Sequence, residues 1–249
     1  MFLIITAMES VFNGFDPSGH FRIWGMENKF DSSSYGLLAK AVYSQSNIKD
    51  QKKEFLKLIN GVTKINTYGE NILFEAADCG HEIIARFICE EKIVDVNAMS
   101  CGVTPFWIAA QKGAIRTMKI LKYYGADPKI ISEKKTSALW IAAQNGHTEI
   151  VKTLIRFGLD VNEPTYNGDS PLITALKHHD IFLCIEALCE KGAKDSSGSA
   201  LCYAVEKCTP QVIQYILTKF DYSPELKRRL ASATKDTAKI QLLCPELFN

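Results

Sequence analysis

A short apolar motif that ends in small residues returns along the chain at a nearly constant interval. Its seven copies begin at Leu38, Leu73, Phe106, Leu139, Leu172, Leu201 and Leu230. The steps between these first residues are 35, 33, 33, 33, 29 and 29 residues. A fixed period in this range is typical of stacked repeat proteins, in which each unit buries its apolar face against its neighbours. The sequence therefore predicts an array with extended surfaces, and such surfaces usually bind rather than catalyse.

The best-defined unit, 134–162, predicts two short helices. Its residues 136–145 form the first helix, and Gly146 ends that helix, as glycine commonly does just past a helix C-terminus. The second helix opens at 147–149 and ends at Gly158. Its apolar residues recur at helical spacing on one face, at Ile150, Val151, Leu154 and Ile155.

The pattern resembles the ankyrin repeat. Val103-Thr104-Pro105-Phe106-Trp107-Ile108-Ala109-Ala110, followed by Gly113, is similar to the family's T-P-L-H-x-A-A-x-x-G. Gly146-His147 and Asp160-Val161-Asn162 are similar to the start of the family's second helix and to its exit. The close resemblance covers four consecutive units, 68–195. It implies an all-α solenoid of stacked helix–turn–helix units with short β-hairpin loops.

The resemblance has two departures. The family's His is missing, and Trp107 and Trp140 stand at that position in adjacent units. We expect both indoles to bury considerable area in the core. The first clear unit also carries one extra residue before Asp95, which predicts a small bulge there.

The ends of the array are expected to be degenerate, because terminal units cap the shared core. Residues 35–43 and 52–60 predict the two helices of the first cap. The predicted organisation is a non-repeat tail at 1–31 and an ankyrin-repeat domain at 32–249. Within that domain we expect an N-terminal cap at 32–67, full repeats at 68–195, and degenerate repeats with a C-terminal cap at 196–249.

Composition excludes several classes of protein. The 249 residues carry 29 basic and 28 acidic side chains, for a net charge of +1, so bulk attraction to nucleic acid is not expected. No apolar run reaches the length of a transmembrane helix. The apolar start at Phe2 has no basic residue before it, and no convincing cleavage site follows, so we do not expect a signal peptide.

The eight cysteines are expected to be free and mostly buried, which indicates a cytoplasmic location, with the nucleus as an alternative. No cofactor or metal is predicted. A zinc site that uses Cys202 and Cys208 is the alternative interpretation of two of these thiols. No phosphate loop, nucleophile elbow or zinc-protease motif is present. The sequence therefore predicts no enzyme, and an unrecognised enzyme that uses His178, His179 and nearby cysteines remains the alternative.

The expected function is a protein–protein interaction module that acts as an adaptor, scaffold, inhibitor or targeting subunit, as a monomer. Family resemblance places partner contacts on the exposed side of the first helices and at the hairpin tips. By register, the candidates are Ile108, Gln111, Lys112, Ile141, Gln144, Asn145, Tyr166, Lys177 and His178. Asn97 and Asn162 also stand in Asp-Val-Asn turns that resemble sites of asparaginyl hydroxylation, so the chain as a hydroxylation substrate is a further alternative.

Overall fold

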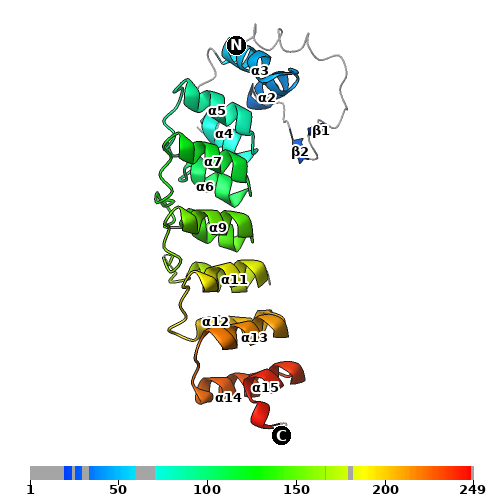
Figure 1. The fold of residues 1–249 in the computed structure, drawn as a ribbon, viewed down its shortest axis with the longest axis vertical. Coiled ribbons are helices and arrows are strands. Elements are labelled where there is room, and N and C mark those ends of the chain that lie inside the picture. The colour runs from blue at the N-terminus through cyan, green and yellow to red at the C-terminus, as the bar shows by residue number, and fades with distance from the viewer. Residues whose placement is uncertain are drawn as a thin grey trace. The chain divides into compact units, whose positions relative to one another are not determined.

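The computed structural model describes six stretches of the chain, namely 20–23, 26–29, 34–59, 71–165, 167–178 and 182–247. The chain divides into two compact units, Met1–Ile130 and Ile131–Asn249. Each unit is built of helix pairs (Figure 1).

The described residues of the first unit form one small hairpin and three helix pairs. Strand β1 (His20–Ile23) pairs antiparallel with β2 (Met26–Lys29), and His20 lies opposite Lys29. The helices are α2 (Ser34–Tyr43), α3 (Ile48–Leu58), α4 (Ile72–Asp78), α5 (Glu82–Glu90), α6 (Pro105–Gln111) and α7 (Ile115–Tyr123). Helix α4 packs against α6, and α5 packs against α7, so first helices stack on first helices and second helices on second helices.

The second unit continues the same pattern. Its helices are α8 (Ala138–Gln144), α9 (Thr148–Arg156), α10 (Pro171–His178), α11 (Phe182–Glu190), α12 (Ser199–Lys207), α13 (Pro210–Lys219), α14 (Pro224–Ala233) and α15 (Thr237–Leu243), with a 3₁₀ turn, η1, at Pro245–Leu247. Helix α10 packs between α8 and α12, and α9 packs against α11. The all-α repeat fold is therefore confirmed.

Side-chain caps and left-handed glycines fix where the short first helices begin and end. Thr104 Oγ1 accepts a hydrogen bond from Trp107 N at 3.2 Å, and Ser137 Oγ accepts one from Trp140 N at the same distance. Each cap satisfies one of the orphan N–H groups of a helix N-terminus. Gly146 follows α8 with φ 70°, a conformation that side chains other than glycine rarely adopt.

Paired alanines allow the helices to pack closely. Ala109 and Ala142 are fully buried, and Ala110 and Ala143 are at most 1% exposed. Because these side chains add little bulk, neighbouring helices approach over them. Trp107 is 9% exposed, so its predicted burial is confirmed. Trp140 is only half-buried, although its Nε1 atom is inaccessible to solvent.

The first cap differs from the prediction in one boundary. Helix α3 begins at Ile48 rather than at Lys52, because Asn47 Oδ1 accepts hydrogen bonds from Lys49 N and Asp50 N. An N-cap of this kind starts a helix wherever the side chain meets the free N–H groups. The β1–β2 hairpin lies within the predicted non-repeat tail, where no strand was expected.

The predicted bulge before Asp95 is accommodated in the loop after α5. Lys92 has φ 52° and stands where the later units have a left-handed glycine, such as Gly125 with φ 96°. Three residue steps separate Lys92 from Asp95, against two from Gly125 to Asp127, so Val94 is the additional residue. The helix pairs on either side keep their packing.

Candidate functional site

In the first unit, the end of α6 presents a polar pair next to α4. Gln111 is half-buried and Lys112 is exposed. Lys112 Nζ lies 2.9 Å from Asp78 Oδ1 at the end of α4. A surface ion pair of this kind contributes little to stability, so its main consequence is to hold two charged groups in fixed positions on the first helices.

In the second unit, a basic side chain on α10 is held from two sides. Lys177 Nζ lies 2.8 Å from both carboxylate oxygens of Asp169, which precedes the helix. The same nitrogen lies 4.6 Å from the ring centroid of Tyr203 on α12. Desolvation is the largest single contribution and lowers the pKa of Lys177. The hydrogen bonds that its ammonium group makes to the side chains of Asp169 and Tyr203 outweigh it, so the pKa is raised overall. The ammonium group is therefore charged and positioned.

Sequence reasoning included Lys177 and omitted Asp169. Asp169 lies eight residues before Lys177, in the loop that leads into α10. Such a loop can fold back along the helix, so that its side chains contact residues of the second helical turn. An acidic residue in the entry loop is the signal that could have identified the pair.

Two further predicted residues lie at the end of α8. Gln144 is half-buried and Asn145 is exposed. Asn145 Nδ2 donates to Ile141 O at 2.9 Å, so its amide also helps to terminate the helix. His178 ends α10 as the register predicts, but its side chain, Tyr166 and His179 lie outside what the structure describes.

The two isoleucines predicted to be exposed on first helices are buried. Ile108 is 5% exposed and Ile141 is 3% exposed, so the prediction that they are accessible is wrong. Helix α6 packs against α4 and α7, and α8 packs against α9 and α10. Each isoleucine therefore belongs to the shared apolar core, and we exclude both from the candidate surface.

The asparagines of the Asp-Val-Asn turns link successive loops. Asn97 Oδ1 accepts a hydrogen bond from Asp127 N at 2.9 Å, and its Nδ2 donates to Gly125 O at 3.4 Å. Asn162 makes the equivalent bonds to Lys194 N at 2.8 Å and to Gly192 O at 3.1 Å. Each asparagine side chain thus pairs a backbone N–H and a backbone C=O group of the next loop, which have no regular secondary structure to pair them.

The cysteines are free, as predicted, and four of them are buried. Burial raises the pKa of Cys184 to about 12 and that of Cys89 to about 11, so these thiols stay protonated at neutral pH. The Cys208 thiol donates to Leu176 O at 3.6 Å. In the stretches of chain that the structure describes, no three His, Cys, Asp or Glu side chains are grouped to hold a metal ion.

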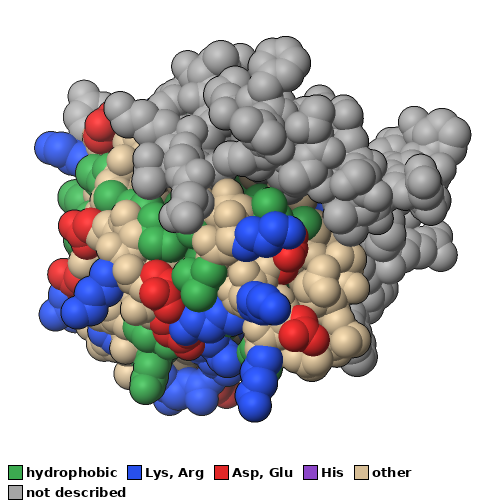
Figure 2. Space-filling model, turned by 90° about the horizontal axis from the view of Figure 1, so that it is seen from above, with side chains coloured by type: hydrophobic (Ala, Val, Ile, Leu, Met, Phe, Trp, Pro, Cys, Tyr) green, Lys and Arg blue, Asp and Glu red, His purple; other side chains and the backbone are tan. Residues whose placement is uncertain are grey.

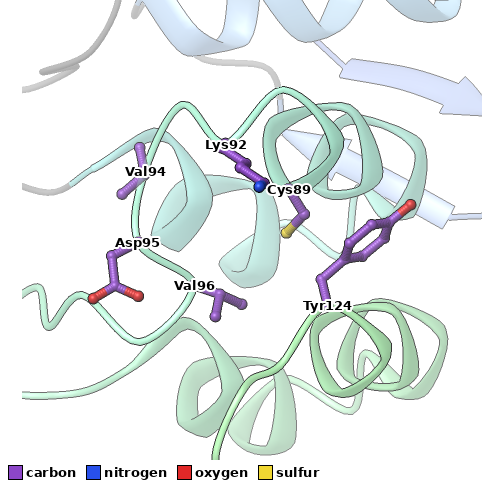
Figure 3. Close-up of a pocket in the computed structure, with 6 residues that line it drawn as sticks. All are labelled: Cys89, Lys92, Val94, Asp95, Val96 and Tyr124. Atoms are coloured by element: carbon purple, nitrogen blue, oxygen red, sulfur yellow. The ribbon is translucent and has the colours of Figure 1, made fainter.

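The extra residue after α5 is accompanied by a hollow on the second-helix side of the first unit. It has a volume of about 360 Å³, and Cys89, Lys92, Val94, Asp95, Val96 and Tyr124 line it. Figure 3 shows the Cys89 sulfur pointing toward the space between Val96 and Tyr124, and the Asp95 carboxylate pointing away from it. The hollow offers a mostly apolar floor and no reactive group, since the Cys89 thiol is protonated.

Charges of both signs lie side by side on the described part of the face that Figure 2 shows. Figure 2 shows Lys and Arg side chains next to Asp and Glu side chains on the described part of the face seen from above. A binder of nucleic acid by bulk electrostatics would instead gather charge of one sign. Among the described helices, none has both the length and the apolar character that crossing a membrane demands.

Comparison with known proteins identifies the repeat. The family model described as "Ankyrin repeats (3 copies)" matches residues 38–132, 106–196 and 139–228. A search of curated proteins found no match to this chain. The three matches together extend over residues 38–228, which is well over half of the 249 residues. They agree with the helix pairs, the caps and the asparagine-linked loops described above, and the chain therefore belongs to the ankyrin-repeat family.

Proposed function

We propose that the chain is a non-enzymatic adaptor or inhibitory subunit that binds a protein partner through its first helices and hairpin tips. Ankyrin repeats are generally protein–protein interaction modules. The observation that carries the finer proposal is the group formed by Lys177, Asp169 and Tyr203 in the second unit.

This group has the properties of a binding anchor. Its ammonium and ring are already fixed in the free protein, so binding costs little side-chain entropy. Tyr203 is half-buried and offers an amphipathic ring, and aromatic residues of this kind are enriched at binding hot spots. Gln144 and Asn145 at the end of α8 add polar contacts in the same unit, and α8 packs directly against α10.

The first unit carries a separate candidate surface of its own. Lys112 and Asp78 form an ordered ion pair there, and Gln111 stands beside it in sequence. Met99 is 45% exposed at the adjoining hairpin tip, where Cys101 and Gly102 form a two-residue turn between Ser100 and Val103. Tyr166 and His178 remain predicted members of the contact set.

The proposal is tested with paired variants. The full chain is immobilised, and proteins retained from a lysate are quantified by mass spectrometry for the wild type, for Lys177→Ala with Tyr203→Ala, and for Lys152→Ala. Lys152 on α9 is the matched control, because it also pairs with an acidic residue, Glu149, at 3.6 Å but stands on a second helix.

We expect the double variant to lose the specific partner and the Lys152 variant to keep it, with circular dichroism unchanged for both. Retention of the partner by the double variant would place the contact elsewhere. Loss by both variants alike would mean that the retention depends on charge in general rather than on this surface.

A second proposal concerns modification. Asn97 and Asn162 occupy the same position in two loops, and both side chains are half-buried rather than inaccessible. We propose them as alternative sites of asparaginyl hydroxylation. Intact-mass measurement after incubation with an asparaginyl hydroxylase should show two added oxygens, one at each site, and the variants Asn97→Ala and Asn162→Ala should each remove one of them.

The proposed location is the cytoplasm, with the nucleus as an alternative. Eight free cysteines, four of them buried within the helix stacks, suit a reducing compartment.

A further inference from the structure

A groove runs along the second-helix side of the first unit, between α3 and α5. Its volume is about 510 Å³, and it is lined by Ile48, Lys49, Lys52, Lys53, Leu56, Arg86, Phe87 and Glu90. These residues stand on second helices, so the groove is separate from the first-helix surface proposed above.

The floor of the groove is apolar and exposed. Ile48 is 47% exposed and Leu56 is 39% exposed, whereas most large apolar side chains of α2 to α7 are buried. Ile48 and Leu56 lie eight residues apart on α3, which is about 12 Å along a helix. The core closes the groove from below, because Phe55 on α3 is fully buried with its ring 5.5 Å from that of Phe87 on α5.

The rim of the groove is basic. Lys49, Lys53 and Arg86 are exposed, and within the described residues none of the three forms an ion pair. Lys52 Nζ lies 2.8 Å from Glu90 Oε2 and 2.9 Å from Glu91 Oε1, so this cluster carries a net charge of −1, against the +3 of Lys49, Lys53 and Arg86. The charge left available to a ligand is therefore positive and lies on both walls of the groove.

We propose that this groove binds an acidic amphipathic helix of a protein partner, whose apolar side chains cover Ile48 and Leu56 while its carboxylates meet Lys49, Lys53 and Arg86. A helix fits because the groove lies between two helices and is about two turns long, the arrangement in which the apolar ridge of one helix packs into the space beside another. Charge complementarity sets the sign of the ligand.

An anionic membrane surface would also complement the lysines, and the geometry disfavours it. The apolar residues line a hollow instead of projecting from the surface, so lipid headgroups could not cover them. Glu90 and Glu91 lie in or beside the groove and would repel phosphate groups, whereas a peptide can place its carboxylates away from them.

The test uses three synthetic probes and the full chain. The first is a fluorescein-labelled 14-residue helical peptide with two leucines seven positions apart and glutamates flanking them. The second carries lysine in place of every glutamate, and the third carries serine in place of both leucines. Binding is followed by fluorescence anisotropy at low salt and at about 0.3 M salt, where surface charge interactions are screened over shorter distances.

The structure predicts saturable binding of the glutamate peptide, weaker at high salt, and at least about tenfold weaker binding of both other peptides. Lys49→Glu with Lys53→Glu should weaken binding of the glutamate peptide at least about tenfold. Lys57→Glu is the matched control, because Lys57 stands on the same helix outside the groove and pairs with Glu54 at 3.5 Å. It should change binding less than about twofold. Lys49→Gln with Lys53→Gln repeats the test if the reversed charges alter the melting temperature.

Several outcomes would overturn the proposal. These are equal binding of the glutamate and lysine peptides, no binding of the glutamate peptide by the wild type, or equal effects of the Lys57 variant and the double variant. Binding to phosphatidylserine vesicles that the double variant abolishes, without any peptide binding, would assign the groove to lipid.

Residues 1–19 of this chain carry Glu9 and Asp16 and no basic side chain. Tighter binding of a synthetic 1–19 peptide than of the glutamate peptide, lost in the double variant, would assign the groove to the chain's own segment.

Discussion

The Tyr222 hydroxyl donates a 2.7 Å hydrogen bond to Asp195 Oδ2, and so ties the loop after α13 to the loop that precedes α12. The same carboxylate oxygen accepts Ala200 N at 3.0 Å and therefore also caps the start of α12. Tyr222 is 6% exposed. Its burial, followed by the hydrogen bond to Asp195, raises the pKa of the tyrosine far above its usual value, so the hydroxyl stays protonated and remains a donor.

Removing this hydrogen bond should destabilise the last repeats. Tyr222→Phe keeps the ring and removes the donor to a charged acceptor, which should lower the free energy of unfolding by about 1.5–3 kcal/mol. Urea unfolding followed by circular dichroism measures the change. Tyr123→Phe is the control, because the Tyr123 side chain is 83% exposed and should change stability by less than about 0.5 kcal/mol. Equal stability of the Tyr222 variant and the wild type would mean that water replaces the bond at no cost.

Protonation of His81 should destabilise the first unit in acid. His81 is 3% exposed, its Nδ1 shares a 2.6 Å hydrogen bond with the Tyr35 hydroxyl, and burial lowers its pKa to about 4. Between pH 6.5 and about 4 the unfolded chain therefore binds a proton that the folded chain does not, so stability falls as pH falls through this window and this contribution is constant outside it. The full difference amounts to about 3 kcal/mol.

The check on His81 is a comparison of pH profiles. His81→Phe keeps an aromatic ring beside Tyr35 and removes the titrating group. The wild type should lose more stability than this variant between pH 7 and pH 4.5 in urea titrations, whatever their difference at pH 7. Parallel profiles would show that other groups account for the acid sensitivity.

Alanine substitutions at two glycines with similar backbone conformations distinguish the cost of backbone strain from the cost of a steric clash with a neighbouring side chain. Gly198 has φ 74°, and a Cβ built there would lie 2.7 Å from Leu226 Cδ2, whereas Gly168 has φ 80° with no atom within 4 Å of such a Cβ. Gly168→Ala should cost about 1–2 kcal/mol through the left-handed conformation alone. Gly198→Ala should cost more, because Leu226 must also move. Equal melting temperatures of the two variants would show that Leu226 moves freely.

Truncation of a core tryptophan should have a large effect. Trp107 is 9% exposed, and Trp107→Ala should lower the free energy of unfolding by about 3–5 kcal/mol, because the site cannot close fully around the missing ring. Trp140→Ala should cost less, since that side chain is only half-buried. Denaturant midpoints of the two variants, measured side by side, check this order. A larger loss for Trp140→Ala than for Trp107→Ala would contradict it.

The helix pairs could be predicted from the sequence because three independent signals agree in register. The apolar period, the capping residues such as Ser137, and the glycines such as Gly146 each specify the same boundaries. The β1–β2 hairpin could not be predicted, because its strands are only four residues long, and the alternation of polar and apolar residues in β1 is not repeated in β2. A structure is easy to predict where periodicity, capping residues and turn residues indicate the same boundaries, and a single short hairpin contains few such residues.

The candidate surface was less predictable than the fold, because exposure depends on neighbouring helices. Register alone placed Ile108 and Ile141 on the binding side, and packing buries both. Lys177 lies near the end of α10, and its pairing with Asp169 depends on how the entry loop turns. The groove beside Leu56 involves α3 and α5, whose relative position no sequence pattern specifies.

The extra residue at Val94 gives an otherwise periodic molecule a point of reference. A partner that recognises only features common to every repeat could bind in several registers, each displaced by one unit from the next. The hollow beside Val94 comes with an insertion that the following loops at Asp127 and Asp160 lack. A ligand that fills this hollow can bind in one register only, so a single inserted residue is enough to make neighbouring repeats distinguishable.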